Sequence, residues 1–274
     1  MIGEIELASR FLKGHIVAIT GSNGKTTTTA LAGDVIAWGG YESQVGGNIG
    51  TPAISLVPEA TDDTYNVLEV SSFQLETIQT FHPEIAVVLN VTPDHLDRHG
   101  SFDQYLAAKE RVFENQTSGD YAVLNADDEQ AARMGNGIKA QVRWFSRKKE
   151  VPQGAFVRDG RIVHRDDAGE HEIMPVSDIP LKGAHNMENV LAAVCVGMII
   201  PCEPHRIRAA VKEFKAVEHR LEFVTTINGV QFYNDWYSTA APKRVNIRNS
   251  SALTGSGMVA SVKPVTSSLI NAVK

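Results

Sequence analysis

The sequence predicts an α/β protein with a phosphate-binding loop, a mostly parallel sheet flanked by helices, and a small antiparallel β annex. Short β-branched runs alternate with helical patterns over the first two-thirds of the chain, which is typical of a parallel sheet. The first of these runs, HIVAIT, leads into the glycine-rich stretch GSNGKTTTT and then into a helical pattern. From about 141 to 176 the pattern changes to short strands separated by turns, which predicts the annex.

The parallel strands are expected where apolar runs are continuous, because such strands are buried on both faces. They are predicted at 15–20, 65–71, 85–91 and 121–127, and helices at 27–38, 52–56, 73–80, 102–115, 187–200 and 205–214. Ser101 and Gln104 fit a capping box at the start of the fourth helix. A hairpin over 221–235 follows, with Asn228-Gly229 as the favoured two-residue turn.

Composition narrows the functional classes. The chain is 43% apolar and 21% charged, as is ordinary for a globular protein, and its net charge of −6 gives no reason to expect nucleic acid. The longest apolar run, Val190 to Ile200, is half the length of a membrane span, and no signal peptide is visible. The two cysteines, Cys195 and Cys202, form neither a disulfide framework nor a ligand set, which suits a reducing cytoplasm.

The loop after the first strand departs from the common phosphate-loop spacing G-x-x-x-x-G-K-[ST]. Ile19 stands where the first glycine is expected, and Gly21 gives the shorter pattern G-x-x-G-K-T. Gly21 and Gly24 would let backbone N–H groups turn inward at a helix N-terminus, which favours anions. Lys25 would add a mobile positive charge and Thr26 a hydroxyl for Mg²⁺. The alternative is a glycine turn followed by a chance Lys-Thr, but the strand and helix around it favour a phosphate loop.

Polar residues follow two further strands. Glu69 ends the second predicted strand, at the carboxyl edge where ligands of parallel sheets bind, although alone it could equally be a surface residue. His95 and His99, four apart in NVTPDHLDRHG, are weak evidence for a metal site, since one such histidine is more often on the surface. Asp94 and Asp97 in the same stretch could cap or pair locally.

Two helical stretches carry further candidates. The pattern of YLAAKERVFEN favours a solvated lysine at Lys109. Asn186 and Asn189 stand three apart at a predicted helix start, where they could be simple N-caps or could recognise a base or a ribose.

Several motifs taken together resemble the Mur ligases, the ATP-dependent amide-forming enzymes of peptidoglycan precursor synthesis. The resemblance runs from about residue 4 to Asp235 and rests on GSNGKTTTT, VGGNIGTPA, LEVSSFQLE, NVTPDHLDRHGSFDQYLAAKERVFEN, GAHNMENVLAA and VEHRLEFV. Within the family, these stretches are most similar to the members that join D-glutamate to UDP-N-acetylmuramoyl-L-alanine. Members that add meso-diaminopimelate or lysine typically have His in place of Phe73.

The resemblance implies ATP and Mg²⁺ as cofactors and assigns roles to the phosphate loop. The ATP phosphates would lie on Gly21, Ser22, Asn23, Gly24, Lys25, Thr26 and Thr27. Thr26 and Glu69 would hold one magnesium ion, and Asn48 would lie beside the γ-phosphate and the muramoyl substrate. These residues would serve transfer of the γ-phosphate to the substrate carboxylate, giving an acyl phosphate that the amine of D-glutamate attacks.

The resemblance also implies roles for residues farther along the chain. His95 would help to hold a second magnesium ion, and Lys109 matches a lysine that is carbamylated in the family. Carbamylation would turn a cation, with an ordinary pKa of about 10.4, into an anionic oxygen ligand. The adenosine side of ATP would contact Asn186, Asn189 and Asp235, the last at the ribose, and Arg220 would lie near the phosphates.

The family has three domains, and the sequence predicts only the central ATP-binding one, at 1–235. Domains for the uridine diphosphate and for the amino acid are expected to be absent, and 236–274 does not match the family. That tail carries five basic residues and no acidic one, which suggests a lost reading frame or a splice of unrelated sequence and predicts a poorly ordered segment. The chain would then be an incomplete ligase or a stand-alone ATP-binding module. Folylpolyglutamate synthetase shares the plan, but its loop usually reads Gly-Lys-Gly-Ser.

Overall fold

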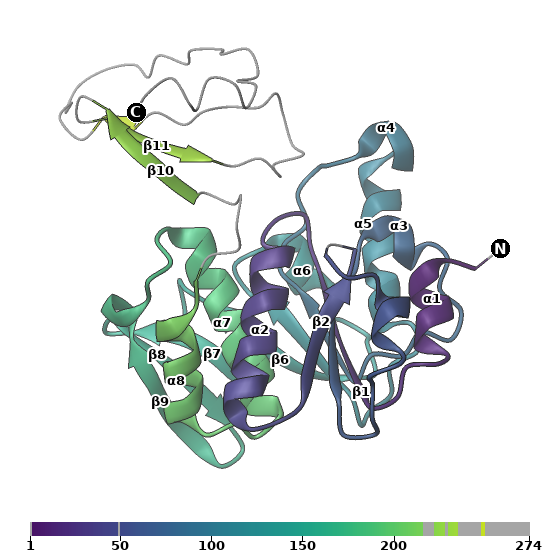
Figure 1. Ribbon diagram of the computed structural model, residues 1–274, viewed down its shortest axis with the longest axis horizontal. Helices are drawn as coiled ribbons and strands as arrows, with labels where there is room; N and C mark the ends of the chain where they lie inside the picture. The colour runs from purple at the N-terminus through teal and green to yellow at the C-terminus, as the bar shows by residue number, and fades with distance from the viewer. Residues whose placement is uncertain (1, 49, 216–221, 228–229, 235–247, 250–274) are drawn as a thin grey trace. The chain divides into compact units, whose positions relative to one another are not determined.

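The computed structural model describes residues 2–48, 50–215, 222–227, 230–234 and 248–249. The chain divides into two compact units, Met1–Lys215 and Ala216–Lys274. The first unit is built on a nine-stranded sheet in the order β2-β3-β1-β4-β5-β6-β7-β8-β9, with helices on both faces (Figure 1). In the described part of the chain, no helix combines the length and the apolar character that crossing a bilayer requires.

Strands β1 to β7 run parallel to one another. They are β1 (His15–Thr20), β2 (Ser43–Gly47), β3 (Tyr65–Glu69), β4 (Ile85–Val88), β5 (Tyr121–Asn125), β6 (Gln141–Ser146) and β7 (Gly154–Arg158). The four predicted parallel strands are confirmed as β1, β3, β4 and β5. Strand β2 was not predicted, because SQVGG is short, contains two glycines and lies at the sheet edge.

The expected antiparallel strands are confirmed, but they extend the main sheet. Strands β8 (Arg161–Asp166) and β9 (Gly169–Pro175) continue it antiparallel from β7. Strand β6, which the sequence placed in the annex, pairs parallel with both β5 and β7. A small apolar cluster of Val151, Phe156 and Val163 packs beneath this end of the sheet.

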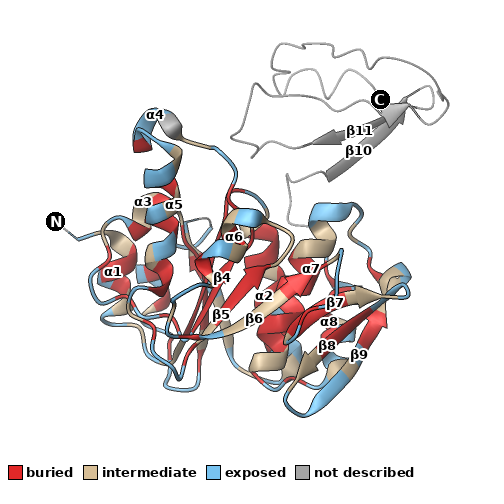
Figure 2. Cartoon of the chain, turned by 180° about the vertical axis from the view of Figure 1, so that it is seen from behind, coloured by how far each residue is buried: buried red, intermediate tan, exposed pale blue. Residues whose placement is uncertain are grey.

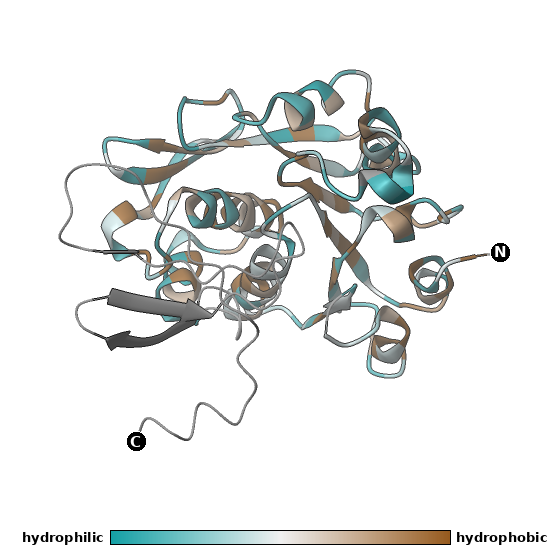
Figure 3. Ribbon diagram, turned by 90° about the horizontal axis from the view of Figure 1, so that it is seen from above, coloured by the Kyte–Doolittle hydropathy of each residue, from teal (hydrophilic) through white to brown (hydrophobic). Residues whose placement is uncertain are grey.

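Helices cover the two faces of the sheet in separate groups. One face carries α1 (Glu4–Ser9), α3 (Ser72–Leu75), α5 (Phe102–Glu110) and α6 (Glu129–Met134), which share a core cluster with Ile16 and Ala18 of β1. The other carries α2 (Lys25–Gly39), α7 (Ala184–Ile199) and α8 (Pro204–Glu213), which pack on one another (Figure 1). Figures 2 and 3 show the central strands buried and largely apolar, as continuous apolar runs predict.

Two predicted helices are shorter in the structure than in the pattern. The stretch 102–115 divides into α5 and the 3₁₀ turn η2 (Arg111–Phe113), and 73–80 forms only α3. Helix α3 stops because the guanidinium of Arg111 donates to the carbonyls of Leu75 and Ile78, both at 2.8 Å. Ser101 does accept the Gln104 amide. The complete capping box lies instead at the start of α3, between Ser71 and Gln74.

Three short elements complete the first unit. They are α4 (Leu96–His99) and the 3₁₀ turns η1 (Ala53–Leu56) and η3 (Val176–Asp178). In the second unit, β10 (Glu222–Ile227) pairs antiparallel with β11 (Val230–Asn234), as predicted, and β12 (Arg248–Asn249) pairs with β11. The predicted turn at 228–229 and most of 236–274 lie outside the described residues, so the boundary at 235 stays a prediction.

Candidate functional site

The glycine-rich loop joins the central strand β1 to the N-terminus of α2, which is the context that the sequence predicted. Helix α2 begins at Lys25, and its N-cap, Gly24, has a φ of 86°. This left-handed conformation favours glycine. A Cβ atom at Gly24 would also lie 2.3 Å from Oδ1 of Asn189. The loop therefore presents a helix N-terminus, where backbone N–H groups favour an anion.

The loop is held in place by Asn90, two residues after the end of β4. The amide of Asn23 donates to Asn90 Oδ1 at 2.9 Å, and Asn90 Nδ2 donates to the Asn23 carbonyl at 3.0 Å. The Ser22 amide donates to the Asn90 carbonyl. Asn90 was not predicted as a site residue. Its position at the end of a strand parallel to β1 is the signal that could have identified it.

Three of the predicted site residues meet at the mouth of the loop. Thr26 Oγ1 donates to Glu69 Oε2 at 2.7 Å, and Asn48 Nδ2 donates to Glu69 Oε1 at 3.1 Å. Glu69 is only 1% exposed, so the alternative that it is a surface residue is wrong. Lys25 lies across the loop, with Nζ 3.0 Å from the Gly21 carbonyl and 3.1 Å from the Ser22 carbonyl.

Lys109 is buried beneath the same loop, so the solvated lysine that its helical pattern favoured is wrong. Its side chain is 1% exposed, and Nζ donates to the Gly21 carbonyl at 2.9 Å and to Thr20 Oγ1 at 3.4 Å. Burial lowers the pKa of Lys109 well below its usual value, and nearby Lys25 lowers it further. Asp94 and Glu69 oppose this shift in the pKa only in part.

Tyr105, one helical turn before Lys109, connects the two sides of the loop. Its hydroxyl lies 2.9 Å from Ser22 Oγ, which donates to the Thr92 carbonyl. Its ring centroid lies 4.7 Å from Lys109 Nζ. Burial raises the pKa of Tyr105 to about 12, although the hydrogen bond to Ser22 opposes that rise. Tyr105 was not predicted as a site residue, and its spacing of four residues from Lys109 is the signal for a shared role.

His95 contacts Asp94 and Phe73 rather than the loop. Its φ is 51°, its Nε2 lies 3.5 Å from Asp94 Oδ2, and its ring centroid is 5.2 Å from that of Phe73. Among the described residues, no three His, Cys, Asp or Glu side chains converge as metal ligands. The role of His95 at a second magnesium ion stays a prediction. His99, the other member of the pair, is buried rather than on the surface.

The two asparagines of α7 do not cap that helix. The N-cap is Gly183, which makes no side-chain capping bond, so the N-cap alternative is wrong. Asn189 faces the loop at Gly24, and its Nδ2 donates to Asn186 Oδ1 at 3.2 Å. This contact places both amides beside the phosphate loop. Arg220 and Asp235 lie outside the described residues.

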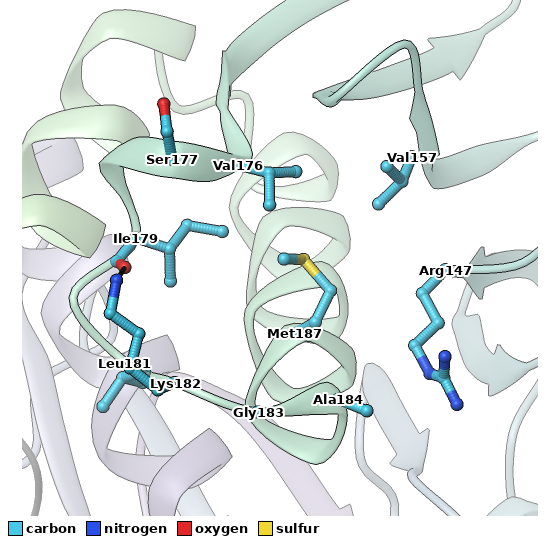
Figure 4. A pocket seen from close by; sticks show the side chains of 10 residues that line it. All are labelled: Arg147, Val157, Val176, Ser177, Ile179, Leu181, Lys182, Gly183, Ala184 and Met187. Carbon is cyan, nitrogen blue, oxygen red and sulfur yellow. Dashed lines mark hydrogen bonds between the residues drawn. The ribbon is translucent and has the colours of Figure 1, made fainter. Parts of the chain in front are cut away.

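A separate hollow of about 520 Å³ lies on another face of the start of α7 (Figure 4). The side chain of Met187 points into it from α7, facing Ile179 and Val157. Its walls are formed by Arg147, Val157, Val176, Ser177, Ile179, Leu181, Lys182, Gly183, Ala184 and Met187. None of these is a predicted ATP-binding residue, although the carbonyl of Lys182 accepts a hydrogen bond from Asn186 Nδ2 at 2.9 Å.

Comparison with known proteins matches residues 19–197 to the Mur ligase middle domain. The UDP-N-acetylmuramoylalanine--D-glutamate ligase of Koribacter versatilis is 62% identical over 239 residues, covering 87% of this chain and 53% of the relative. The protein of the same name from Acidobacterium capsulatum is 57% identical over 241 residues, covering 87% and 52%. The chain thus spans about half the length of these curated relatives.

Solved structures share the fold at low sequence identity. MurF from Acinetobacter baumannii superposes with a TM-score of 0.64 at 20% identity, covering 84% of this chain and 52% of that one. A pseudomurein peptide ligase type C from Methanothermus fervidus has a TM-score of 0.61 at 20% identity, with coverages of 80% and 53%. The family model spans most of the described first unit and includes the glycine-rich loop. The chain belongs to the Mur ligase family.

Proposed function

We propose that this chain is the nucleotide-binding part of a cytoplasmic, ATP-dependent ligase of peptidoglycan precursor synthesis that joins D-glutamate to UDP-N-acetylmuramoyl-L-alanine. The observation that carries the proposal is the hydrogen-bonded set of Thr26, Glu69 and Asn48 at the mouth of a phosphate loop. The names of the relatives with 62% and 57% identity support this choice of substrates.

The loop residues would bind and orient the triphosphate. Backbone amides between Gly21 and Thr27 would face the phosphates at the N-terminus of α2, and Lys25 would exchange its loop carbonyls for phosphate oxygens. ATP would supply the phosphoryl group that turns the substrate carboxylate into an acyl phosphate, which the amine of D-glutamate attacks. Preorganised positive groups suit this chemistry because charge builds on the transferring oxygens.

The residues around Glu69 fit a magnesium ion. Thr26 and Glu69 offer a hydroxyl and a carboxylate, which are hard oxygen ligands of the kind that Mg²⁺ prefers. A carboxylate that is 1% exposed also needs compensation for lost hydration, and a divalent cation would provide it. Asn48 would orient the carboxylate through its amide. His95 would serve at a second ion.

Lys109 fits carbamylation. Burial lowers the pKa of its amine well below the usual value, which favours the neutral form whose lone pair carbamylation requires. That lone pair would form a bond to the carbon of CO₂ while the nitrogen gives up a proton, leaving an anionic carbamate beside the phosphate loop. On the other side of the loop, the amides of Asn186 and Asn189 would recognise adenine. Arg220 and Asp235 remain the family-based proposals for the phosphates and the ribose.

Calorimetric titration of the full chain with ATP and Mg²⁺ tests the nucleotide site. A lost charge-assisted contact is worth about 1.5–3 kcal/mol, so Lys25→Ala should weaken ATP binding about 10-fold or more. Lys139→Ala removes an exposed lysine away from the loop and should leave the affinity unchanged. Equal ATP affinity in Lys25→Ala and the parent chain would contradict the proposed site.

Phosphate release tests the reaction. A ligase should release phosphate from ATP only when both UDP-N-acetylmuramoyl-L-alanine and D-glutamate are present. ATP binding without this dependence would favour the second candidate, a stand-alone ATP-binding module. The fact that the chain spans about half the length of its relatives is the reason to keep that candidate.

A further inference from the structure

The buried side chain of His99 joins the turn over 95–99, which carries His95, to Ser72 and Glu76; we call His99, Ser72 and Glu76 the clamp. His99 is the last residue of α4, and both of its ring nitrogens have partners on or beside α3. Its Nδ1 lies 2.9 Å from Glu76 Oε1, and its Nε2 lies 3.0 Å from Ser72 Oγ. A carboxylate only accepts, so Nδ1 carries the proton toward Glu76, and in the neutral tautomer Nε2 accepts from the Ser72 hydroxyl.

The ring of Phe73 connects His99 to His95. The Phe73 and His99 rings are stacked, with centroids 4.9 Å apart and planes 8° apart. The same phenyl ring lies 5.2 Å from the His95 ring. Arg98 lies over it, with Cζ 3.8 Å from the ring centroid. Phe73 is therefore in contact with both histidines and with Arg98, which lies between them in the sequence.

Helix α4 cannot hold this geometry by itself. It has four residues, and a single turn of helix is unstable without tertiary contacts. The amides of Arg98 and His99 both donate to the His95 carbonyl at 3.1 Å, so the two ends of the turn are mechanically linked. His95 has a φ of 51°, a left-handed conformation that persists only where the surroundings impose it.

We propose that His99 is a positioning residue. Held by Ser72 and Glu76, it fixes Phe73 and the turn over 95–99, and in this way it sets the place of the His95 imidazole. The link from His95 to a metal ion rests on the proposed function, whereas the clamp itself does not. The clamp borders a surface hollow lined by Glu76, Arg98, His99, Gln104, Ala107, Ala108 and Arg111. Glu76 is therefore partly exposed to solvent, so it can be substituted without leaving a cavity in the core.

The clamp is tested first in the ligand-free full chain. His99→Phe keeps an aromatic ring beside Phe73 but loses both hydrogen bonds. Amide exchange over 95–99 should become about 10-fold faster, and the His95 ring C–H resonance should shift or broaden. Glu76→Ala should produce the same changes from a partly exposed position, even if His99→Phe does not fold. Glu76→Gln, whose carbonyl oxygen still accepts, should restore the parent behaviour.

Glu129→Ala is the control. Its side chain is exposed, like that of Glu76, and it pairs with Arg133 on α6 rather than with His99. It should change neither the exchange rate over 95–99 nor the His95 resonance. Parent-like exchange and an unshifted His95 resonance in both His99→Phe and Glu76→Ala would overturn the proposal.

Metal affinity separates the inference from the proposed function. Mn²⁺ binding in the presence of ADP is measured by electron paramagnetic resonance. His95→Ala and Glu76→Ala should each weaken it about 10-fold, as changes behind a ligand typically do. The double variant should bind no more weakly than His95→Ala, because both changes act through one imidazole. Absence of Mn²⁺·ADP binding in the parent chain would refute the proposed function. A loss in His95→Ala without one in Glu76→Ala would refute the positioning role.

Discussion

The amine of Lys109 lies where its surroundings disfavour a positive charge. Burial lowers the pKa of this amine, which means that keeping the amine protonated costs folding free energy. The amine nevertheless lies within reach of Gly21 and Thr20 at the base of the phosphate loop. A residue that is unfavourable for stability and well placed for chemistry is typical of a functional site.

Lys109→Met should therefore stabilise the chain while abolishing the proposed ligation. Methionine fills a similar volume without requiring desolvation of an amine. A gain of about 1 kcal/mol would raise Tm by about 2–4 °C, measured by scanning calorimetry at pH 7 in CO₂-free buffer. A lower Tm would show that the hydrogen bonds of the amine outweigh its desolvation.

His164 on β8 predicts a dependence of stability on pH. Its two ring nitrogens have no hydrogen-bond partner among the described residues. Burial lowers its pKa from 6.5 to about 4; Asp166 opposes this shift, while His171 and Arg143 add to it. Between pH 6.5 and 4 the imidazole binds a proton in the unfolded chain but not in the folded chain. The free energy of unfolding should therefore fall as the pH falls.

Urea unfolding between pH 7 and pH 4 measures this slope. In His164→Leu, the part of the slope due to this imidazole should disappear, and the midpoint at pH 4.5 should rise relative to the parent chain. His171→Leu, on the neighbouring strand, removes a more exposed imidazole and should keep most of the slope. Parallel slopes in the parent and His164→Leu chains would contradict this account.

At the scale of elements, α1 depends on one buried carboxylate. Glu6 accepts hydrogen bonds from the amides of Gln79, Thr80 and Phe81. Burial raises the pKa of Glu6, but these amides, the Thr80 hydroxyl and Arg10 outweigh burial and bring the pKa to about 2. Its contribution to stability should be present above pH 4.5 and lost as the pH falls toward 2.

Glu6→Gln should lower the free energy of unfolding by about 2 kcal/mol at pH 7, because buried amide donors lose a charged acceptor. Glu4→Gln on the same helix removes the charge of a partly exposed acceptor for the Ile54 amide and should cost much less. Denaturant unfolding of the two variants gives the comparison. Equal losses would mean that α1 is held by its apolar face alone.

The elements also show what local sequence can predict. Buried strands such as β1 and β4 were predicted because every residue in them faces a core. Helix α3 was predicted too long, because its end is set by Arg111, which lies far along the chain and binds its carbonyls. The burial of Lys109 was missed for a similar reason, since the loop above its helix face is contributed by a distant strand.

At the scale of the whole molecule, sheet order brings the site together. The chain moves from β1 to one side of the sheet for β2 and β3, and then to the other side for β4. Ligands of such sheets bind where the order reverses, beyond the carboxyl ends of the strands. Thr26 and Glu69 could be predicted because they end or follow strands. Asn90 and Tyr105 were missed because they support the loop through contacts with residues far away in the sequence.

The first unit should fold without the second. The extended core cluster, from Ile5 to Ala140, lies entirely within Met1–Lys215. A fragment ending at Lys215 should therefore unfold cooperatively, with a Tm within about 2–4 °C of the corresponding transition in the full chain, which corresponds to less than about 1 kcal/mol. A broad transition without a defined midpoint would show that residues 216–274 contribute to this core.

The carbonyl oxygen of Gly21 receives Lys25 from α2 and Lys109 from α5, at 3.0 and 2.9 Å. These helices cover opposite faces of the sheet, so this one carbonyl oxygen accepts a hydrogen bond from each of the two outer helical layers. Drawing one nitrogen toward an incoming anion changes the potential felt by the other. A change of charge in one helical layer can therefore alter the electrostatic potential in the other without any movement of the strands between them.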